Sequence, residues 1–584
     1  MKRLKLITIA LLTACAIYAF TNFKREQKSF DVTAYKLGAA IGCMANISSI
    51  EEVLDSVEIE PMYGVGNHKW KIATTSDSAQ FYFNQGINLY YGFHTIESLA
   101  SFKKAAKFDS TCAMAWWGQA LSVGPTINTW DYPEKPEAQA AIQKAKLLSV
   151  AAPPIEKLMV DAMTQRYSAD TTQKRAQMNQ RYTEAMQKIY RNYTDKPDVA
   201  ALYADAMMIQ HPWNYWNLDG SAKAWTPPIE SVLEALLAKT PEHPGANHYY
   251  IHLMEGSPFA AKALPSADRL GQLTPGQAHM VHMPSHIYLR TGQYDKSVLI
   301  NEASVMQYKQ EGAAFPPVQH IANRHNNHAR QMAANCAMLA GQYTKAIQTA
   351  LQLQHSIDSA GISFPEPIGN FVQYVFMTPV FINIRFEKWN NLLRMKQPSS
   401  KDVYANVLYH FGRGVAYAGL NEVSNAEQEL RRLQELMSEK TLTLTFGPLS
   451  PPIEGAKVAN ELLQGFIQVS QKKQDEAIEH FSKAVAFDDG IAYSEPRTPW
   501  LLNPRQYLGM AYLKAEQQEK ATAVFKQDLQ RNADNVWSLY GLYQALALQH
   551  KKAEADRIKM KFDKAAAKSD IDFSELEFST ASIK

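Results

Sequence analysis

The sequence is poor in cysteine: among 584 residues there are four, namely Cys15, Cys43, Cys112 and Cys336. They are far apart and form no CxxC pair, which excludes a cysteine zinc ribbon and a scaffold built on disulfides. At most one disulfide can join the three cysteines that follow the N-terminal segment. In a chain of this length we expect these cysteines to be buried free thiols.

The chain also has no strong charge excess and lacks several common enzyme motifs. Its 60 basic and 57 acidic residues leave a net charge of +3 without a long basic block, so nucleic acid is not an expected partner. A Walker phosphate loop, a GxGxxG motif after a strand and a GxSxG elbow are absent. No run of alternating β-branched residues lies between turn signals, and this predicts a fold without a β-sheet.

The first twenty residues have the pattern of an export signal. Three basic residues among the first five precede an apolar run at 6–20, which is signal-like and short for a membrane span. Residues 12–15 read LTAC and resemble a bacterial lipoprotein signal, although the residues after Cys15 stay apolar. Lipidation at Cys15, cleavage after Ala19 and retention as a membrane anchor are all open. Each outcome predicts an exported protein, in the periplasm or attached to a membrane.

Small and bulky residues recur at fixed spacings in two parts of the chain. The first set has spacings of 12, 4 and 3 residues and consists of Gly86, Ser98, Phe102 and Ala105. The same pattern recurs, completely or in part, at Gly465, Ala477, Phe481 and Ala484, at Gly509, Ala521 and Phe525, and at Gly541 and Ala553. These are the packing positions of tetratricopeptide (TPR) hairpins, small where two helices touch and bulky where one hairpin meets the next.

The sequence therefore predicts an all-α fold, a TPR-like α-solenoid or superhelix of antiparallel helix hairpins. Proline-rich loops and changes in regularity divide it. The predicted parts are a signal peptide or lipoprotein anchor at 1–20, an N-terminal extension at 21–78 with a helix near 32–47, a TPR-like array with a histidine-rich concave site at 79–355, an irregular helical segment at 356–455 and C-terminal TPR repeats at 456–570.

Histidine is concentrated in one stretch of the N-terminal array. Nine of the sixteen histidines lie within residues 243–328. His248 and His282 are 34 residues apart, and so are His252 and His286, which is the length of a TPR unit. Consecutive units thus carry an i, i+4 histidine pair on one face of a helix.

Aligning the unit around Ser285 with the repeat around Gly465 places these pairs on the first helices of consecutive hairpins. If Ser285 is position 8 of its 34-residue unit, the two histidines of each pair occupy positions 5 and 9 of their unit, and His279 occupies position 2. In the following unit His328 takes position 2 and Asn335 takes position 9. First-helix positions line the concave surface of TPR arrays, so three consecutive hairpins direct polar side chains to one inner wall.

Two such pairs on neighbouring helices can supply four ligands to one metal ion, and imidazole suits zinc, copper and iron. We therefore predict a divalent transition-metal site made of His248, His252, His282 and His286. This is not the HExxH motif of zinc proteases, because Tyr249 and Met283 follow the first histidine of each pair. His243 and His320 fall in loops in this register and lie outside the predicted site.

The same wall predicts a catalytic residue and a set of ligand-binding residues. Glu255, at position 12, can ligate the metal, orient a histidine or act as a base, and is the catalytic candidate. An insertion at 488–500 adds polar and aromatic residues, and such insertions often lie on the binding face. The predicted ligand-binding residues are His279, His328, Asn335, Arg290, Glu495, Arg497 and Trp500.

Other interpretations stay open beside the metal site. Histidines in a helical groove can bond to one another, to backbone carbonyls or to a bound peptide without any metal. The chain is then a peptide- or protein-binding scaffold of the cell envelope. The expected partner is a peptide, a protein or a small molecule in the concave groove, with membrane contact only through the N-terminal anchor. A metal-dependent enzyme that uses the same cluster is the third possibility.

Several strings resemble a family of bacterial TPR proteins of largely undefined function. They extend from about residue 66 to residue 555 and include SAQFYFNQGINLYYGF, HPGANHYYIH, HMVHMPSHIYLRTGQY, RHNNH and SEPRTPW. The four histidines of the predicted metal site fall in the most characteristic of these strings. The string GFHTIES departs from the pattern, which has asparagine before the histidine and alanine at Ser98. The resemblance implies the helical-repeat fold and implies no particular reaction.

Overall fold

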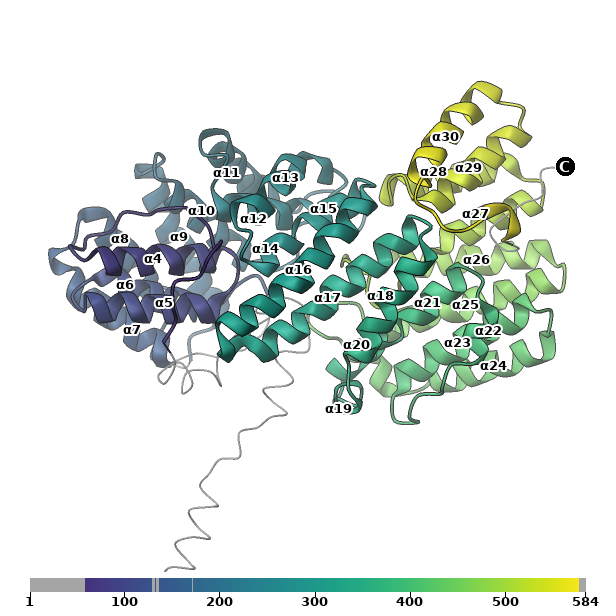
Figure 1. Cartoon of the computed structure of the whole chain (residues 1–584), viewed down its shortest axis with the longest axis horizontal. Coiled ribbons are helices and arrows are strands. Elements are labelled where there is room, and N and C mark those ends of the chain that lie inside the picture. The colour runs from purple at the N-terminus through teal and green to yellow at the C-terminus, as the bar shows by residue number, and fades with distance from the viewer. Residues whose placement is uncertain (1–57, 129–131, 133–135, 171, 577–584) are drawn as a thin grey trace, which may run out of the picture.

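The computed structural model describes residues 58–128, 132, 136–170 and 172–576. These residues form an all-α solenoid whose helices follow one another along the long axis of the molecule (Figure 1). No β-strand occurs among them, and Trp216 and Ala222 form one isolated bridge. The predicted signal segment, Cys15, Cys43 and the predicted helix near 32–47 lie outside the described residues. No helix of the described part is long and apolar enough to cross a membrane.

The first half of the described chain contains the hairpins that carry most of the histidines. Its helices are α4 (Asp77–Tyr91), α5 (Thr95–Phe108), α6 (Ala113–Ser122), α7 (Pro136–Leu148), η2 (Ser149–Ala151), α8 (Pro154–Thr164), α9 (Arg175–Asn192), α10 (Pro197–Ile209), α11 (Thr226–Lys239), α12 (Pro244–Met254), η3 (Ala260–Ala263), α13 (Leu264–Leu273), α14 (Ala278–His282), α15 (Pro284–Arg290), α16 (Tyr294–Ala314), η4 (Pro316–Val318), α17 (Gln319–Leu339) and α18 (Tyr343–His355).

The second half continues the helical array to the C-terminal hairpins, drawn in green and yellow in Figure 1. Its helices are α19 (Ser359–Ile362), α20 (Ile368–Phe376), α21 (Thr378–Arg385), α22 (Trp389–Leu393), α23 (Val403–Gly419), α24 (Val423–Leu436), η5 (Lys440–Thr443), α25 (Pro452–Ser470), α26 (Gln474–Asp489), α27 (Pro504–Lys514), α28 (Gln518–Arg531), α29 (Val536–Leu548), α30 (Lys552–Ala565) and η6 (Phe573–Glu575).

The predicted packing positions explain how the hairpins stack. Phe102 of α5 lies against both Gly86 of α4 and Gly118 of α6, so that a Cβ atom on either glycine would clash with its ring. Phe525 of α28 lies in the same way between Gly509 and Gly541. A large second-helix side chain thus fills the space that the missing side chains leave on its own first helix and on the next one. This contact holds consecutive hairpins at close range.

One predicted packing position is wrong. Ala553 is exposed, and Ala555 is the buried alanine of α30. Ala555 follows the buried Ala521 by 34 residues, the full length of a unit, whereas Ala553 was placed by its distance from Gly541. Gly541 contacts the preceding Phe525 and does not mark the start of the same register in its own hairpin.

The register of the histidine-bearing hairpin agrees with the alignment. The Ser297 hydroxyl of α16 donates to the Ser285 carbonyl of α15 at 3.3 Å. The Ser98 hydroxyl of α5 donates to the Gly86 carbonyl of α4 at 2.7 Å, with the same spacing of 12 residues. Both serines are completely buried. In both hairpins, a serine of the second helix therefore joins the two helices by a hydrogen bond.

The array folds back on itself around the histidine helices. The C-terminal end of α4 reaches α12, where the Tyr91 carbonyl meets the His248 side chain, 157 residues later in the chain. Gly64 and Gly276 pack backbone to backbone, joined by a 2.8 Å hydrogen bond between the Gly276 amide and the Gly64 carbonyl. The first-helix wall is thus covered by earlier parts of the chain. Cys112 and Cys336 are buried free thiols, as predicted.

Candidate metal centre

Six histidines form two groups of three, and each group follows the same positional rule. The i, i+4 pair of one unit meets the position-2 histidine of the next unit. In each group, one possible ligand atom per residue lies within 4.8 Å of the others. Trio one is His248, His252 and His279, from α12 and α14. Trio two is His282, His286 and His328, from α14, α15 and α17.

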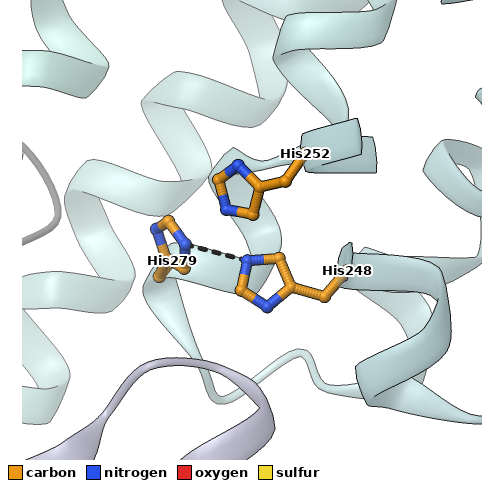
Figure 2. Close-up of side chains that lie close together, drawn as sticks. All are labelled: His248, His252 and His279. Atoms are coloured by element: carbon orange, nitrogen blue, oxygen red, sulfur yellow. Dashed lines mark hydrogen bonds between the residues drawn. The ribbon is translucent and has the colours of Figure 1, made fainter. Parts of the chain in front are cut away.

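In trio one the three rings point toward a common centre (Figure 2). His248 Nε2 and His279 Nε2 are 3.0 Å apart. The other nitrogen of His248, Nδ1, lies 2.5 Å from the Tyr91 carbonyl oxygen. Because a carbonyl can only accept, Nδ1 carries the proton, and neutral His248 therefore presents its lone pair at Nε2.

His252 completes trio one with the same orientation of its ring. Its Nδ1 donates to the Glu255 carboxylate at 2.8 Å. Its Nε2 is buried and has no hydrogen-bond partner. An unpaired buried nitrogen is costly in a folded protein, and a metal ion at the centre of the trio would satisfy it.

Trio two repeats the arrangement with different outer partners. His282 Nδ1 donates to the Asn301 side-chain oxygen at 2.6 Å, and the Asn301 amide nitrogen is itself committed to the Ser297 carbonyl. His282 Nε2 therefore bears the lone pair and lies 3.0 Å from His286 Nε2. The His328 ring lies 4.7 Å from the His282 ring and 5.6 Å from the His286 ring, measured between centroids.

Glu255 joins the two trios through its two carboxylate oxygens. Oε1 accepts from His252 of trio one, and Oε2 lies 2.5 Å from His286 Nδ1 of trio two. This second contact is an ion pair and not a hydrogen bond, because its angle is unfavourable. A carboxylate behind a metal-binding imidazole fixes the ring and raises its basicity. Here a single carboxylate serves one imidazole of each trio.

The charges of these groups follow from burial and from Glu255. Burial lowers the pKa values of five imidazoles, that of His328 to about 3, and the affected residues are His248, His252, His279, His282 and His328. Burial opposes charge on Glu255 and His286 as well, but their mutual attraction prevails. It lowers the pKa of Glu255 to about 2 and raises the pKa of His286. Five neutral imidazoles are thus ready to act as ligands.

The distances suit a metal ion. A tetrahedral zinc ion with Zn–N bonds of 2.0–2.1 Å holds its nitrogens roughly 3.3 Å apart. One nitrogen pair in each trio is 3.0 Å apart and requires a small outward movement to reach that value, while the ligand atoms of each trio all lie within 4.8 Å of one another. Three histidines also leave a fourth position for water or a substrate, as in catalytic zinc sites.

The predicted single shell of four histidines does not form. The two pairs are held apart because the Glu255 carboxylate lies between His252 and His286 and binds both. His279 and His328, predicted as ligand-binding residues, complete the trios instead. The sequence signal was present, since both occupy position 2 of their units. Glu255 itself is 1% exposed and contacts imidazoles through both oxygens, while its catalytic role stays a prediction.

The histidine wall is largely covered, since five of the six trio histidines are at most 3% exposed. The Phe93 ring lies within 4.5 Å of the His248 ring and 5.7 Å of the His279 ring, measured between centroids. Trp213 meets His252 edge to face at 5.2 Å. Both aromatic residues have positive φ angles, 59° and 60°, a conformation that costs energy for a bulky side chain. They shield trio one with apolar surface.

A third group of titratable residues has a different character. His68 Nε2 lies 2.7 Å from Asp198, and the Tyr91 hydroxyl donates to the same carboxylate oxygen at 2.8 Å. His243 caps α12 by accepting from the Ala246 amide at Nδ1, so its proton is on Nε2, which faces Asp198 at 3.6 Å. Sequence reasoning missed this group, since His243 was assigned to a loop and nothing marked His68 or Asp198.

The other predicted site residues lie around a large cavity or in the core. A cavity of about 1210 Å³ lies between the histidine helices and the C-terminal hairpins. Four of the predicted ligand-binding residues line it, together with His252 of trio one, and these four are Arg290, Asn335, Glu495 and Arg497. Trp500 is fully buried instead, and packs edge to face against Phe381 and Phe411.

Comparisons with known proteins return distant helical-repeat structures. The human IFIT1 dimer with m7Gppp-AAAA aligns at 12% identity over 85% of this chain and 92% of its own, with a TM-score of 0.30. The APC/C hetero-tetramer Cut9–Hcn1 aligns at 11% identity over 82% and 78%, with a TM-score of 0.28. The P58(IPK) TPR domain aligns at 11% identity over 81% and 99%, with a TM-score of 0.20.

No protein-family model and no curated protein sequence matches the chain. At such identities and scores, the structural likenesses carry no argument about function. The helical-repeat fold rests on the hairpins and packing positions of the chain itself, and the function must be inferred from its own side chains.

Proposed function

We propose that this protein binds two transition-metal ions, one in each histidine trio, inside a TPR-like solenoid. The observation that carries the proposal is the orientation of four imidazoles. Each directs Nδ1 outward to an oxygen, and the four oxygens belong to the Tyr91 carbonyl, the Glu255 carboxylate, which serves two rings, and the Asn301 amide. Metal-bound histidines are held in this way in known sites.

Zinc, copper and iron are the candidate metals. Neutral imidazoles bind all three, and the two trios contain no thiolate that would favour one of them. The apolar cover of Phe93 and Trp213 limits water at trio one and strengthens the metal–ligand interactions there. In this arrangement Glu255 acts as a positioning residue for both metals. The enzyme hypothesis is the open extension of this proposal, since a three-histidine site leaves a position for a substrate.

Metal analysis of the protein purified without a histidine tag tests the proposal. The chain is treated with a chelator, loaded with Zn²⁺, Cu²⁺ or anaerobic Fe²⁺, desalted and measured by plasma mass spectrometry. We expect two ions per chain for at least one of the metals. The proposal fails if the loaded wild type retains no more metal than a loaded carrier protein without metal sites.

The third member of each trio provides matched variants. His279→Phe and His328→Phe keep an aromatic ring in contact with its neighbours and remove the ligand nitrogen. Each single variant should retain one ion and the double variant none. His480→Phe is the control, because His480 also pairs with a carboxylate, that of Glu461 at 2.8 Å, and belongs to neither trio. Metal retained equally by the wild type and the double variant would refute the site.

The scaffold hypothesis depends on a different property of the chain. The helical-repeat architecture is of the type that displays surfaces for peptides and proteins. The histidines themselves are too deeply buried to contact a partner of that size, since five of the six are at most 3% exposed. A pull-down whose partner is retained by the His279→Phe, His328→Phe double variant would assign protein binding to other surfaces.

Export belongs to the proposal and rests on residues 1–20. Their basic start and apolar run are the supporting pattern, with Cys15 as the candidate lipidated residue. Fractionation of cells that express the full chain, with Cys15→Ser as the comparison, tests it. Release of Cys15→Ser from the membrane fraction supports lipidation, whereas a cytoplasmic wild type contradicts export.

A further inference from the structure

The large cavity has a composition that the metal trios do not explain. Its volume of about 1210 Å³ exceeds the upper end of the usual range for small-molecule sites, about 300–1,000 Å³. Its lining carries six basic and three acidic side chains, the basic ones being Lys223, Arg290, Arg385, Arg497, Arg505 and Arg531. An excess of positive charge in a partly enclosed site favours a negatively charged ligand.

Three of these arginines converge around two carboxylates. Arg497 Nε lies 3.0 Å from Asp488, and Arg505 pairs with Asp489 through two nitrogens at 2.6 and 2.8 Å. Arg531 is also 3.0 Å from Asp489. Burial and then the charge of Arg497 lower the pKa of Arg531, as expected where positive charges crowd. Three guanidinium groups face two carboxylates, so this part of the wall has one positive charge more than Asp488 and Asp489 can neutralise.

Two further arginines extend the positive wall. Arg290 donates through its two terminal nitrogens to the Arg531 and Ser257 carbonyls at 3.0 and 3.2 Å. It is 3.9 Å from Glu495, too far for a close ion pair, and its Nε is buried without a hydrogen-bond partner. Arg385 is 3% exposed, and its guanidinium lies 4.0 Å from the centre of the Trp537 ring. Its Nη1 donates to the Gln506 side-chain oxygen at 3.0 Å, and this bond together with the stacking fixes the guanidinium group in place at the cavity wall.

The remaining walls offer flat apolar surface. Five aromatic residues line the cavity, namely Trp213, Tyr215, Trp216, Tyr493 and Trp537. Trp213 also touches His252, whose Nε2 is the unpaired nitrogen of trio one. A ligand in this cavity therefore meets arginines, aromatic rings and the edge of trio one at His252 within one lining.

We infer that the cavity binds a small organic polyanion that has a planar or aromatic part, with carboxylates or similar anionic groups at the arginines and its flat part against the tryptophans. The arginines and tryptophans act whether or not the trios hold metal. The inference thus goes beyond the metal proposal, and the wall at His252 makes such an anion the candidate substrate or co-ligand of trio one.

Benzene-1,3,5-tricarboxylate and its uncharged triamide form a suitable pair of probes. Calorimetric titration uses full-length protein treated with chelator, so that failure of metal binding leaves this test unaffected. We expect binding of the tricarboxylate and none of the triamide. Arg385→Gln and Arg290→Gln should each weaken binding roughly tenfold, because each removes a charged donor. Arg413→Gln is the control, since Arg413 also stacks on tyrosines and lies away from the cavity.

Gln527 gives a pair of variants that should fold like the wild type, because its side chain is exposed. It is exposed at the cavity lining, and Gln527→Glu and Gln527→Lys introduce opposite charges at one position. Binding should weaken with glutamate and strengthen with lysine, each by roughly two- to threefold. Equal binding of both probes, no binding of the tricarboxylate at millimolar concentration, or arginine and Gln527 variants that all match the wild type would each overturn the inference.

Discussion

Helix α12 contributes histidines to two groups, one from its N-cap and two from within the helix, and the two groups use their imidazoles in opposite ways. At the N-terminus, His243 turns a lone pair toward the Ala246 amide and its N–H toward Asp198. Further along, His248 and His252 turn their N–H groups outward, to Tyr91 and Glu255, and their lone pairs inward. A carboxylate lies inside the first group and outside the second.

This difference separates a structural group from a metal site. In the His68–Asp198–His243 group the charge of Asp198 is satisfied by histidine and tyrosine donors, and burial is outweighed so that the pKa of Asp198 is lowered. A cation there would have to displace the protons of His68 and Tyr91, which already form bonds to Asp198. In the trios the inward nitrogens lack such partners or face each other. All three groups have metal-like spacing, and they differ in the positions of their protons and of the carboxylate.

The strongest contrast is expected between His252→Ala and His243→Asn, at the two ends of α12. His252→Ala should remove the ion of trio one. The metal affinity of that trio should fall more than roughly a hundredfold, because one of its three ligands is lost. His243→Asn should keep both ions, since asparagine is a good helix cap and costs at most about 1 kcal/mol. Metal titration with calorimetry measures both. Loss of metal in His243→Asn would show that the third group belongs to a metal site.

The next effect concerns Glu255. Glu255→Gln should reduce metal affinity about 10- to 100-fold in both trios, because it weakens the outer partner of His252 and of His286. In the metal-free protein it should also reduce the free energy of unfolding by about 3–5 kcal/mol, since the buried pair of Glu255 and His286 loses its carboxylate. Metal titration and denaturant unfolding provide the two measurements. An effect confined to one trio would contradict the shared role.

Asp198→Asn tests the structural group directly. The asparagine keeps an acceptor for Tyr91 but removes the charge that His68 and His243 face. We expect unfolding to become easier by about 3 kcal/mol, with metal content unchanged. Urea unfolding and metal analysis of the same preparation decide this. A loss of metal with unchanged stability would reverse the assignment of the two groups.

The smallest expected effect is a pH dependence at His94. Burial opposes its charge, but the charge of Glu311 and the Glu97 hydrogen bond raise its pKa to about 9. A raised folded-state pKa contributes stability that is complete below the unfolded value, about 6.5, and is lost as pH rises through about 9. Unfolding between pH 7 and 9 should become easier by on the order of 1–2 kcal/mol. His94→Gln should flatten this slope, and an unchanged slope would contradict it.

Much of the fold was predictable because helix packing is local. The spacing of Gly86, Ser98 and Phe102 identifies a hairpin, and the same spacing around Ser285 places the histidine pairs on first helices. Ala553 shows the limit of this reasoning, because an alignment from a neighbouring glycine was two residues out of register. The site was predictable only as far as the repeat rule reaches.

The partition of the histidines was not predictable, because it depends on contacts between distant residues. Glu255 separates the pairs by lying between α12 and α15. Asp198 and His68 meet across 130 residues of sequence. The arginine wall combines Arg290 with Arg385 and the end of α28. No local spacing encodes any of these contacts.

The sequence alone determined the all-α repeat architecture and the helix positions of the six histidines, since both follow from periods of 34 residues and less. The tertiary structure decided which of those histidines meet, how each is oriented and what covers them. The physical reason is that a buried imidazole must direct its proton to an acceptor, and here folding supplied that acceptor: the end of α4 for His248, the Glu255 carboxylate for His252 and the Asn301 side chain for His282.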